Sequence, residues 1–150
     1  MNIHFQITPF NELTVAELYD ILQLRTAVFV VEQNCVYQDM DGKDQAGLHL
    51  LVKSDEGTLL AYARLLPPHT SYTEPSIGRV VSNPSFRKAG FGKALMQKAI
   101  DSVSASWPHQ GIRISAQLYL LQFYQNLGFS TVGESYLEDD IPHIEMLYIN

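Results

Sequence analysis

The chain carries Arg87-Lys88-Ala89-Gly90-Phe91-Gly92 between an apolar segment around Val80-Val81 and a helical run that begins near Gly92. A glycine-rich loop between a strand and a helix leaves several backbone N–H groups unpaired, and an anion can bind where they converge. Its glycines carry no Cβ that would block a ligand, while Arg87 and Lys88 add positive charge. The segment therefore predicts a phosphate-binding loop, and the alternative is a glycine-rich turn that caps an ordinary helix.

Two familiar phosphate-binding motifs do not fit this segment. A Walker A loop needs glycine at position 87 and Ser or Thr after Gly92-Lys93, where the chain has Arg87 and Ala94. A dinucleotide fingerprint needs a third glycine at position 95, where the chain has Leu95. The remaining pattern is Arg-x-x-Gly-x-Gly after a strand.

Length and charge limit the class of protein. A chain of 150 residues with 46% hydrophobic residues predicts a single domain, 1–150, with a substantial core. The formal net charge of -6 argues against a binder of nucleic acid or of anionic membranes and favours cationic substrates. The acidic stretches 39–44 and 138–140 would attract a cation, although acidic loops more often only face solvent.

The cysteine and histidine content argues against disulfide and metal sites. Cys35 is the single cysteine, and the N-terminal residues lack the basic and apolar regions of a signal peptide, so a cytoplasmic location is expected. The five histidines have no metal-ligand spacing, and we expect no metal. No apolar run approaches the ~20 residues that a membrane-spanning helix needs.

Hydrophobic periodicity predicts an α/β or α+β fold. Thr14 and Glu17 form a capping box at the start of a helix that extends to about Val31, and residues 32–47 form a loop. Alternating or continuous apolar runs predict strands at 3–7, 48–53, 58–66, 76–82, 112–116, 129–136 and 143–149. Helical spacing predicts two further helices, from Phe91 to Trp107 and over 120–127.

A second motif makes the pattern specific. The sequence from Tyr124 to Phe129 has the form Tyr-x-x-x-Gly-Phe and follows the glycine loop after a strand. The pair of motifs resembles the GNAT N-acetyltransferase superfamily. Segments 24–35, 37–42 and 141–144 narrow the resemblance to the ElaA-like group of small bacterial GNAT proteins, with one departure, Asp140, where glycine is expected. The resemblance implies the GNAT acyl-CoA N-acyltransferase fold, with a mixed central sheet flanked by helices and strands 4 and 5 splayed.

The resemblance also implies a binding site for acetyl-CoA. The backbone of Val80 and Val81 would pair with the pantetheine arm, whereas their side chains are better explained as core. The pyrophosphate would bind the segment after this strand, which comprises Arg87, Lys88, Ala89, Gly90, Phe91, Gly92 and Lys93.

Acetyl transfer needs a proton donor for the departing thiolate and a base for the amine. By resemblance, Tyr124 is the donor and contacts the cofactor, although its helical position also fits a core aromatic. Glu32, His143 and Glu145 are the candidates for the base, and His143 is preferred for a role beside the substrate; a structural histidine is the alternative. Arg25 lies on the apolar side of its helix, so a structural ion pair is expected.

The sequence therefore predicts a cytoplasmic N-acetyltransferase that moves the acetyl group from acetyl-CoA to a primary amine. The acceptor is a small molecule or a protein. The alternative is a CoA-binding regulatory module without turnover. GNAT proteins are often dimers, so a homodimer is an expectation from the resemblance alone.

Overall fold

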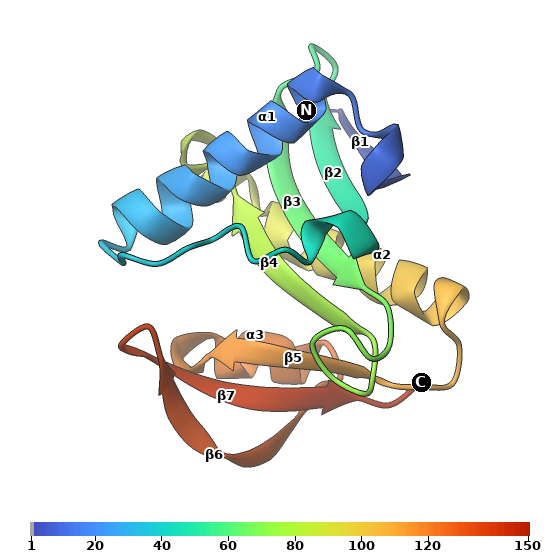
Figure 1. Ribbon diagram of the computed structural model, residues 1–150, viewed down its shortest axis with the longest axis vertical. Helices are drawn as coiled ribbons and strands as arrows, with labels where there is room; N and C mark the ends of the chain where they lie inside the picture. The colour runs from blue at the N-terminus through green and yellow to red at the C-terminus, as the bar shows by residue number, and fades with distance from the viewer. Residues whose placement is uncertain (1) are drawn as a thin grey trace.

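The computed structural model describes residues 2–150, and its centre is a mixed seven-stranded sheet (Figure 1). The strands are β1 Ile3–Pro9, β2 Leu48–Ser54, β3 Leu59–Leu66, β4 Ser76–Ser82, β5 Ile112–Gln117, β6 Ser130–Glu138 and β7 Ile141–Tyr148. They lie in the order β1-β2-β3-β4-β5-β7-β6. The β4–β5 pair is parallel and the others are antiparallel, so the predicted mixed sheet is confirmed.

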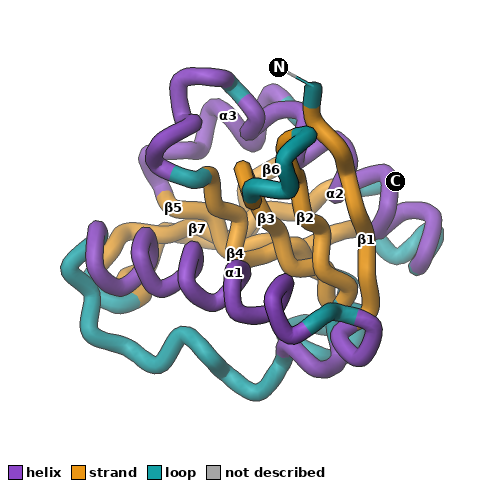
Figure 2. The backbone as a smooth tube through the Cα atoms, turned by 90° about the horizontal axis from the view of Figure 1, so that it is seen from above, coloured by secondary structure: helices purple, strands orange, loops and turns teal. Residues whose placement is uncertain are grey.

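Helices cover both faces of this sheet. Helix α1, Val15–Arg25, packs on one face, while α2, Phe91–Ser106, and α3, Leu121–Asn126, pack on the other (Figures 1 and 2). All eight residues of β3 are buried, because this central strand is covered on both sides. Within residues 2–150, no helix has the length and apolar content to cross a membrane.

The first helix changes its geometry before it reaches the cleft described below. Thr14 and Glu17 form the predicted capping box, in which each side chain accepts the other's backbone N–H, at 3.0 and 2.9 Å. After Arg25 the helix continues as a π-helix, Thr26–Glu32, and the Gln33 N–H donates to a carbonyl five residues earlier. The predicted extent to about Val31 is confirmed, but apolar spacing could not distinguish α from π geometry.

The loop after the π-helix is held by a largely buried arginine–aspartate cluster. Its members are Arg25, Arg64, Arg79, Asp39, Asp41 and Asp44. Fully buried Arg25 donates from Nε to Asp39 and from Nη1 to Asp44, each at 2.8 Å, which confirms the predicted ion pair. The guanidinium groups hold the pKa of Asp41 and that of Asp44 below their usual range against the effect of burial.

The cluster corrects one expectation from the sequence. The sequence leaves two alternatives for stretch 39–44, attraction of a cation or simple exposure to solvent, but its aspartates are bound to arginines of the same chain. Asp39 and Asp44 are also buried. This stretch therefore anchors the loop to the sheet and offers little free negative charge.

Candidate active site

Strands β4 and β5 separate soon after they begin. Their ladder contains a single pair, Ser76 with Arg113, next to a backbone bond from the Arg113 N–H to the Pro75 carbonyl. Beyond this point the strands diverge, and Figure 1 shows the gap between β4 and the β5–β7–β6 strands. The predicted splaying of strands 4 and 5 is confirmed.

A β-bulge in β4 accompanies the separation. Two residues of β4, Arg79 and Val80, lie opposite the single residue Ala63 of β3, and Arg79 has a left-handed φ of 50°. A bulge bends its strand and increases its twist, which turns β4 away from β5. Asp39 holds the bulge in place, because Arg79 Nε lies 2.8 Å from its carboxylate and Nη2 donates to its carbonyl at 2.9 Å.

The backbone of β4 beyond the bulge faces the opening. The Asn83 N–H donates to the Leu60 carbonyl, which belongs to β3. Because backbone groups alternate sides along a strand, those of Val80 and Ser82 point toward the cleft. The Val81 side chain is buried against α1, as expected for a core residue.

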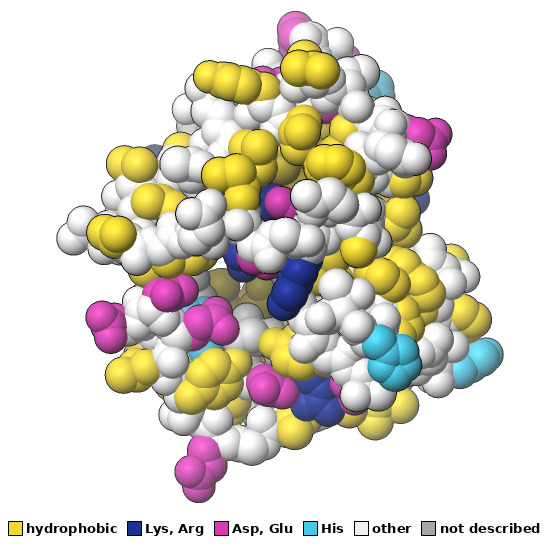
Figure 3. Space-filling view, in the orientation of Figure 1, with side chains coloured by type: hydrophobic (Ala, Val, Ile, Leu, Met, Phe, Trp, Pro, Cys, Tyr) yellow, Lys and Arg dark blue, Asp and Glu magenta, His cyan; other side chains and the backbone are white. Residues whose placement is uncertain are grey.

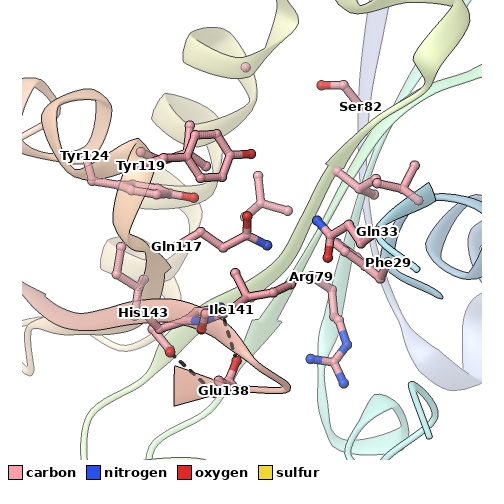
Figure 4. A pocket seen from close by; sticks show the side chains of 18 of the residues that line it. Phe29, Gln33, Arg79, Ser82, Gln117, Tyr119, Tyr124, Glu138, Ile141 and His143 are labelled. Carbon is pink, nitrogen blue, oxygen red and sulfur yellow. Dashed lines mark hydrogen bonds and ion pairs between the residues drawn. The ribbon is translucent and has the colours of Figure 1, made fainter. Parts of the chain in front are cut away.

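A cleft with a volume of about 510 Å³ lies between β4 and β5. Figure 3 shows the hollow with acidic and basic side chains gathered around it. The π-helix contributes Phe29, and Gln33 follows it; α3 contributes Tyr124, and β7 contributes His143 (Figure 4). Segments from both halves of the chain thus meet around one cavity.

The glycine-rich segment lies at the start of α2. Residues 84–89 form a 3-10 helix, and Gly90 then takes a left-handed φ of 75° where α2 begins. Within residues 2–150, no side chain caps α2, so its first N–H groups can bind an anion. An ideal Cβ at Gly90 would have no neighbouring heavy atom within 4 Å, so glycine is favoured here by its φ and the space beside it is open. These residues fit a diphosphate.

The structure brings seven of the predicted site residues to the cleft wall. They are Glu32, Val80, Val81, Arg87, Gly92, Tyr124 and His143. The other predicted cofactor-binding residues lie beside the wall: Lys88, Ala89, Gly90 and Lys93 are exposed, and the Phe91 side chain is part of the core. Glu145, the third candidate base, is bound by Arg113 at 3.0 Å and does not line the cleft.

Two of these residues form an ion pair with each other. Arg87 Nη2 lies 2.5 Å from Glu32 Oε1, and each side chain is 44% exposed. The pair connects the 3-10 helix before α2 with the end of the π-helix. A phosphate at α2 would compete with Glu32 for this guanidinium.

Tyr124 lies in an aromatic environment with its hydroxyl toward the cavity (Figure 4). Its ring makes edge contacts with Phe123 and Phe129, at centroid distances of 5.2 and 6.0 Å. Burial, with a smaller effect from Tyr119, raises the pKa of Tyr124 to about 12. The phenol therefore stays protonated at neutral pH and can donate a hydrogen bond into the cleft.

His143 is a buried residue of β7 and lies opposite Tyr136 of β6. The two rings stack with their centroids 6.2 Å apart. Its Nδ1 lies 2.7 Å from the Ile141 carbonyl, which can only accept, so Nδ1 carries a proton. In the neutral ring, Nε2 is then the free base, and it lies 3.4 Å from Glu138 Oε2.

Sequence reasoning missed several lining residues. They include Phe29, Gln33, Arg79, Ser115, Gln117, Tyr119 and Glu138. The polar positions of β5 alternate with its buried ones, and that alternation marks Ser115 and Gln117 as facing away from the core. Gln33 and Arg79 had no such signal, because their placement depends on the π-helix and on the bulge.

Similarity to known proteins agrees with this geometry. The chain belongs to the acetyltransferase (GNAT) family, since the family's domain model matches residues 15–149. Within that family it is similar to protein ElaA of Escherichia coli, with 46% identity over 147 residues, 96% of this chain and 95% of that protein. The predicted superfamily and ElaA-like resemblance are confirmed.

Solved structures share the fold. An acyl-CoA N-acyltransferase from Pseudomonas aeruginosa superposes with a TM-score of 0.92 at 44% identity, covering 98% of this chain and 99% of that one. An aminoglycoside 6'-N-acetyltransferase complexed with coenzyme A has a TM-score of 0.68 at 16% identity, covering 96% of both chains, which supports the fold alone.

Proposed function

We propose that this protein transfers the acetyl group of acetyl-CoA to a primary amine. One observation carries the proposal: the cleft between β4 and β5 reaches the uncapped start of α2 at Arg87 and Gly92. A long ligand with a diphosphate and a thioester arm fits this arrangement. Membership in the acetyltransferase family and the coenzyme A bound by a protein of the same fold support it.

The chain would hold the cosubstrate mainly through its backbone. The cleft-facing groups of β4 at Val80 and Ser82 would pair with the amide groups of pantetheine, as an added strand does. The N–H groups from Ala89 to Gly92 and the positive end of α2 would bind the pyrophosphate. Arg87 would exchange Glu32 for a phosphate oxygen, and Lys88 and Lys93 would add charge at the rim.

The transfer exchanges a C–S bond for a C–N bond. An ammonium acceptor gives one proton to a base, and its lone pair attacks the thioester carbonyl carbon. As the C–S bond breaks, the thiolate takes a proton from the Tyr124 hydroxyl, and the phenolate recovers the second proton of the amine nitrogen. The first proton leaves to solvent from the base, so the products are an amide, a thiol and one proton.

Tyr124 suits the donor role because it faces the cavity in its protonated form. With a pKa of about 12 it is a weaker acid than a thiol, whose ordinary value is about 8.5. It therefore acts as a hydrogen-bond donor to the sulfur and gives up its proton only when it receives another.

The base is assigned to His143 in this proposal. Its Nε2 is the free nitrogen of a ring that the Ile141 carbonyl orients. Glu32 also lines the cleft, but its carboxylate is already bound to the Arg87 guanidinium. Glu32 would act as a base only after a phosphate of the cosubstrate has displaced it from the Arg87 guanidinium.

A thiol-release assay tests the proposal. Acetyl-CoA is mixed with a panel of small amines and lysine-containing peptides, and free thiol is measured. We expect turnover with at least one amine and a fall of at least tenfold in kcat for Tyr124→Phe. Tyr148→Phe is the matched control, because Tyr148 packs against Phe129 outside the cleft wall.

The alternative is a CoA-binding module without turnover. Calorimetric binding of CoA with no thiol release across the panel would support it, and absence of CoA binding would refute both functions. A cytoplasmic location, a single-domain chain and a homodimer remain parts of the proposal that fractionation, limited proteolysis and light scattering can check.

A further inference from the structure

We propose that Glu138 binds the acceptor's ammonium group together with His143, and so makes the site selective for cationic primary amines. The inference rests on the proposed function and names a residue that the sequence motifs did not indicate. It follows from the arrangement of hydrogen-bond acceptors on one wall of the cleft.

This wall is the polar face of the β5–β7–β6 strands. Gln117 and Tyr136 lie directly across from His143 on its two neighbouring strands, so the three side chains share one face. Glu138 lies two residues after Tyr136 and therefore points the same way. The apolar residues of β5 and β7 face α2 and α3 instead, which leaves the polar face to the cleft.

Two acceptors converge on this wall without a close donor. The proton on His143 Nδ1 leaves Nε2 of the neutral ring as an acceptor, and Glu138 Oε2 lies 3.4 Å from it. The Ser115 hydroxyl is 3.5 Å from Glu138 Oε1. Both separations exceed the usual hydrogen-bond range of about 2.7–3.2 Å. Among residues 2–150, Glu138 has no shorter side-chain partner. A primary ammonium group, with three N–H donors, would satisfy both acceptors.

The charges around the cleft favour the same ligand. Arg79 and Arg87 line the wall, but they are paired with Asp39 and Glu32. The carboxylate of Glu138, which is 51% exposed at the cleft, is not balanced by an arginine or lysine of residues 2–150. An ammonium group would therefore gain an ion pair at the nitrogen that gives its proton to His143.

The position of the pair also suits the reaction. Figure 4 shows Tyr124 and the His143–Glu138 pair at different parts of the same cavity. The thioester sulfur would approach the first and the amine nitrogen the second, so the carbonyl carbon would lie between them.

Steady-state kinetics of Glu138→Gln test the proposal with an amine that the wild type acetylates. We expect KM for the amine to rise at least tenfold, while KM for acetyl-CoA changes less than twofold. Glu134→Gln is the matched control, since Glu134 is an exposed carboxylate of the same strand outside the cleft wall. Equal KM values for the amine in both variants would overturn the assignment.

A binding measurement separates this inference from the proposed function. The imidazole resonances of His143 are followed by NMR in the CoA-bound protein during titration with n-butylammonium chloride or with 1-butanol. We expect the ammonium to shift them in the wild type, with at least tenfold weaker binding in Glu138→Gln, and the alcohol to have no effect. CoA binding without any response to the ammonium would refute the role of Glu138 alone. Absence of CoA binding would refute the proposed function.

Discussion

Replacing Asp39 with asparagine should destabilise the protein strongly. The Asp39 carboxylate is 4% exposed and accepts from Arg25 Nε at 2.8 Å and from the Tyr37 hydroxyl at 2.7 Å. Its second oxygen also faces Arg79 Nε at 2.8 Å. An asparagine keeps one acceptor oxygen, so its NH₂ group would meet one of these donors, and the cluster would carry an uncompensated positive charge.

The expected cost follows from the burial of the pair. Removing one partner from a buried ion pair costs about 3–5 kcal/mol, because a charge stays buried without its partner. For a domain of this size, each kcal/mol lowers Tm by about 2–4 °C, so the variant should melt roughly 6–20 °C lower. Since Asp39 also holds the bulge at Arg79, CoA should bind more weakly to whatever fraction stays folded.

Urea unfolding followed by circular dichroism measures the free energy directly. Asp101→Asn is the control, because Asp101 is exposed on α2 and accepts a hydrogen bond from Gln97. This variant should change the free energy of unfolding by less than about 0.5 kcal/mol. A loss of less than 1 kcal/mol for Asp39→Asn would refute the view that the buried cluster stabilises the loop.

Two further predictions concern a helix cap and a turn. Hydrogen bonds from the Lys53 ammonium group and from the Thr14 backbone N–H lower the pKa of Glu17 from 4.5 to about 2. The stability that the ionised Glu17 contributes is therefore present above pH 4.5 and is lost as the pH falls toward 2. Glu17→Gln should therefore flatten that part of the pH–stability curve and cost about 1 kcal/mol at neutral pH, measured by urea unfolding. The control is Glu12→Gln, a change at an exposed residue, which should alter the free energy of unfolding at neutral pH by less than about 0.5 kcal/mol. Asp139 and Asp140 both have left-handed φ values, 50° and 63°. Asp140→Gly should therefore raise the free energy of unfolding by about 0.5–1 kcal/mol, whereas Asp140→Ala should lower it. Thermal melts compare the variants, and equal melting temperatures would refute the idea that the backbone is strained at Asp140.

The sequence predicted the order of strands and helices well because their apolar patterns are regular. Strand β4 was predicted at its observed bounds, 76–82, and the capping box at Thr14 was also correct. Both features depend on neighbouring residues alone. The apolar stretch of β4 ends at polar residues, and a capping box needs a hydroxyl residue with a glutamate three positions later.

The ion pairs that hold the loop between the first helix and β2 could not be predicted from the sequence. Asp39, Asp41 and Asp44 looked like solvent-facing charges, and their arginine partners are 14 to 40 positions away. No local pattern indicates that Arg64 and Arg79, on adjacent strands, point to the same loop. Such long-range pairs depend on strand register, which periodicity alone does not fix.

The candidate site also combines residues that local motifs indicate with residues whose placement depends on long-range contacts. The sequence indicated the glycine loop and Tyr124 as candidates because each belongs to a local motif, whereas it indicated Glu138 only as part of an acidic loop. Its position beside His143 depends on the pairing of β6 with β7, where Tyr136 faces His143.

Under the proposed role of Glu138, the turn between these strands affects the amine site as well as the fold. Two left-handed residues, Asp139 and Asp140, connect Glu138 directly to Ile141, and this tight turn fixes the register of the hairpin at its end. A slip by one residue would turn Tyr136 and Glu138 to the other face of the sheet, and His143 would lose Glu138 as its neighbour on the cleft wall. The chain keeps the left-handed turn although Asp140 stands where its relatives were expected to have glycine. The left-handed φ of Asp140 is therefore part of the turn that places Glu138 Oε2 3.4 Å from His143 Nε2.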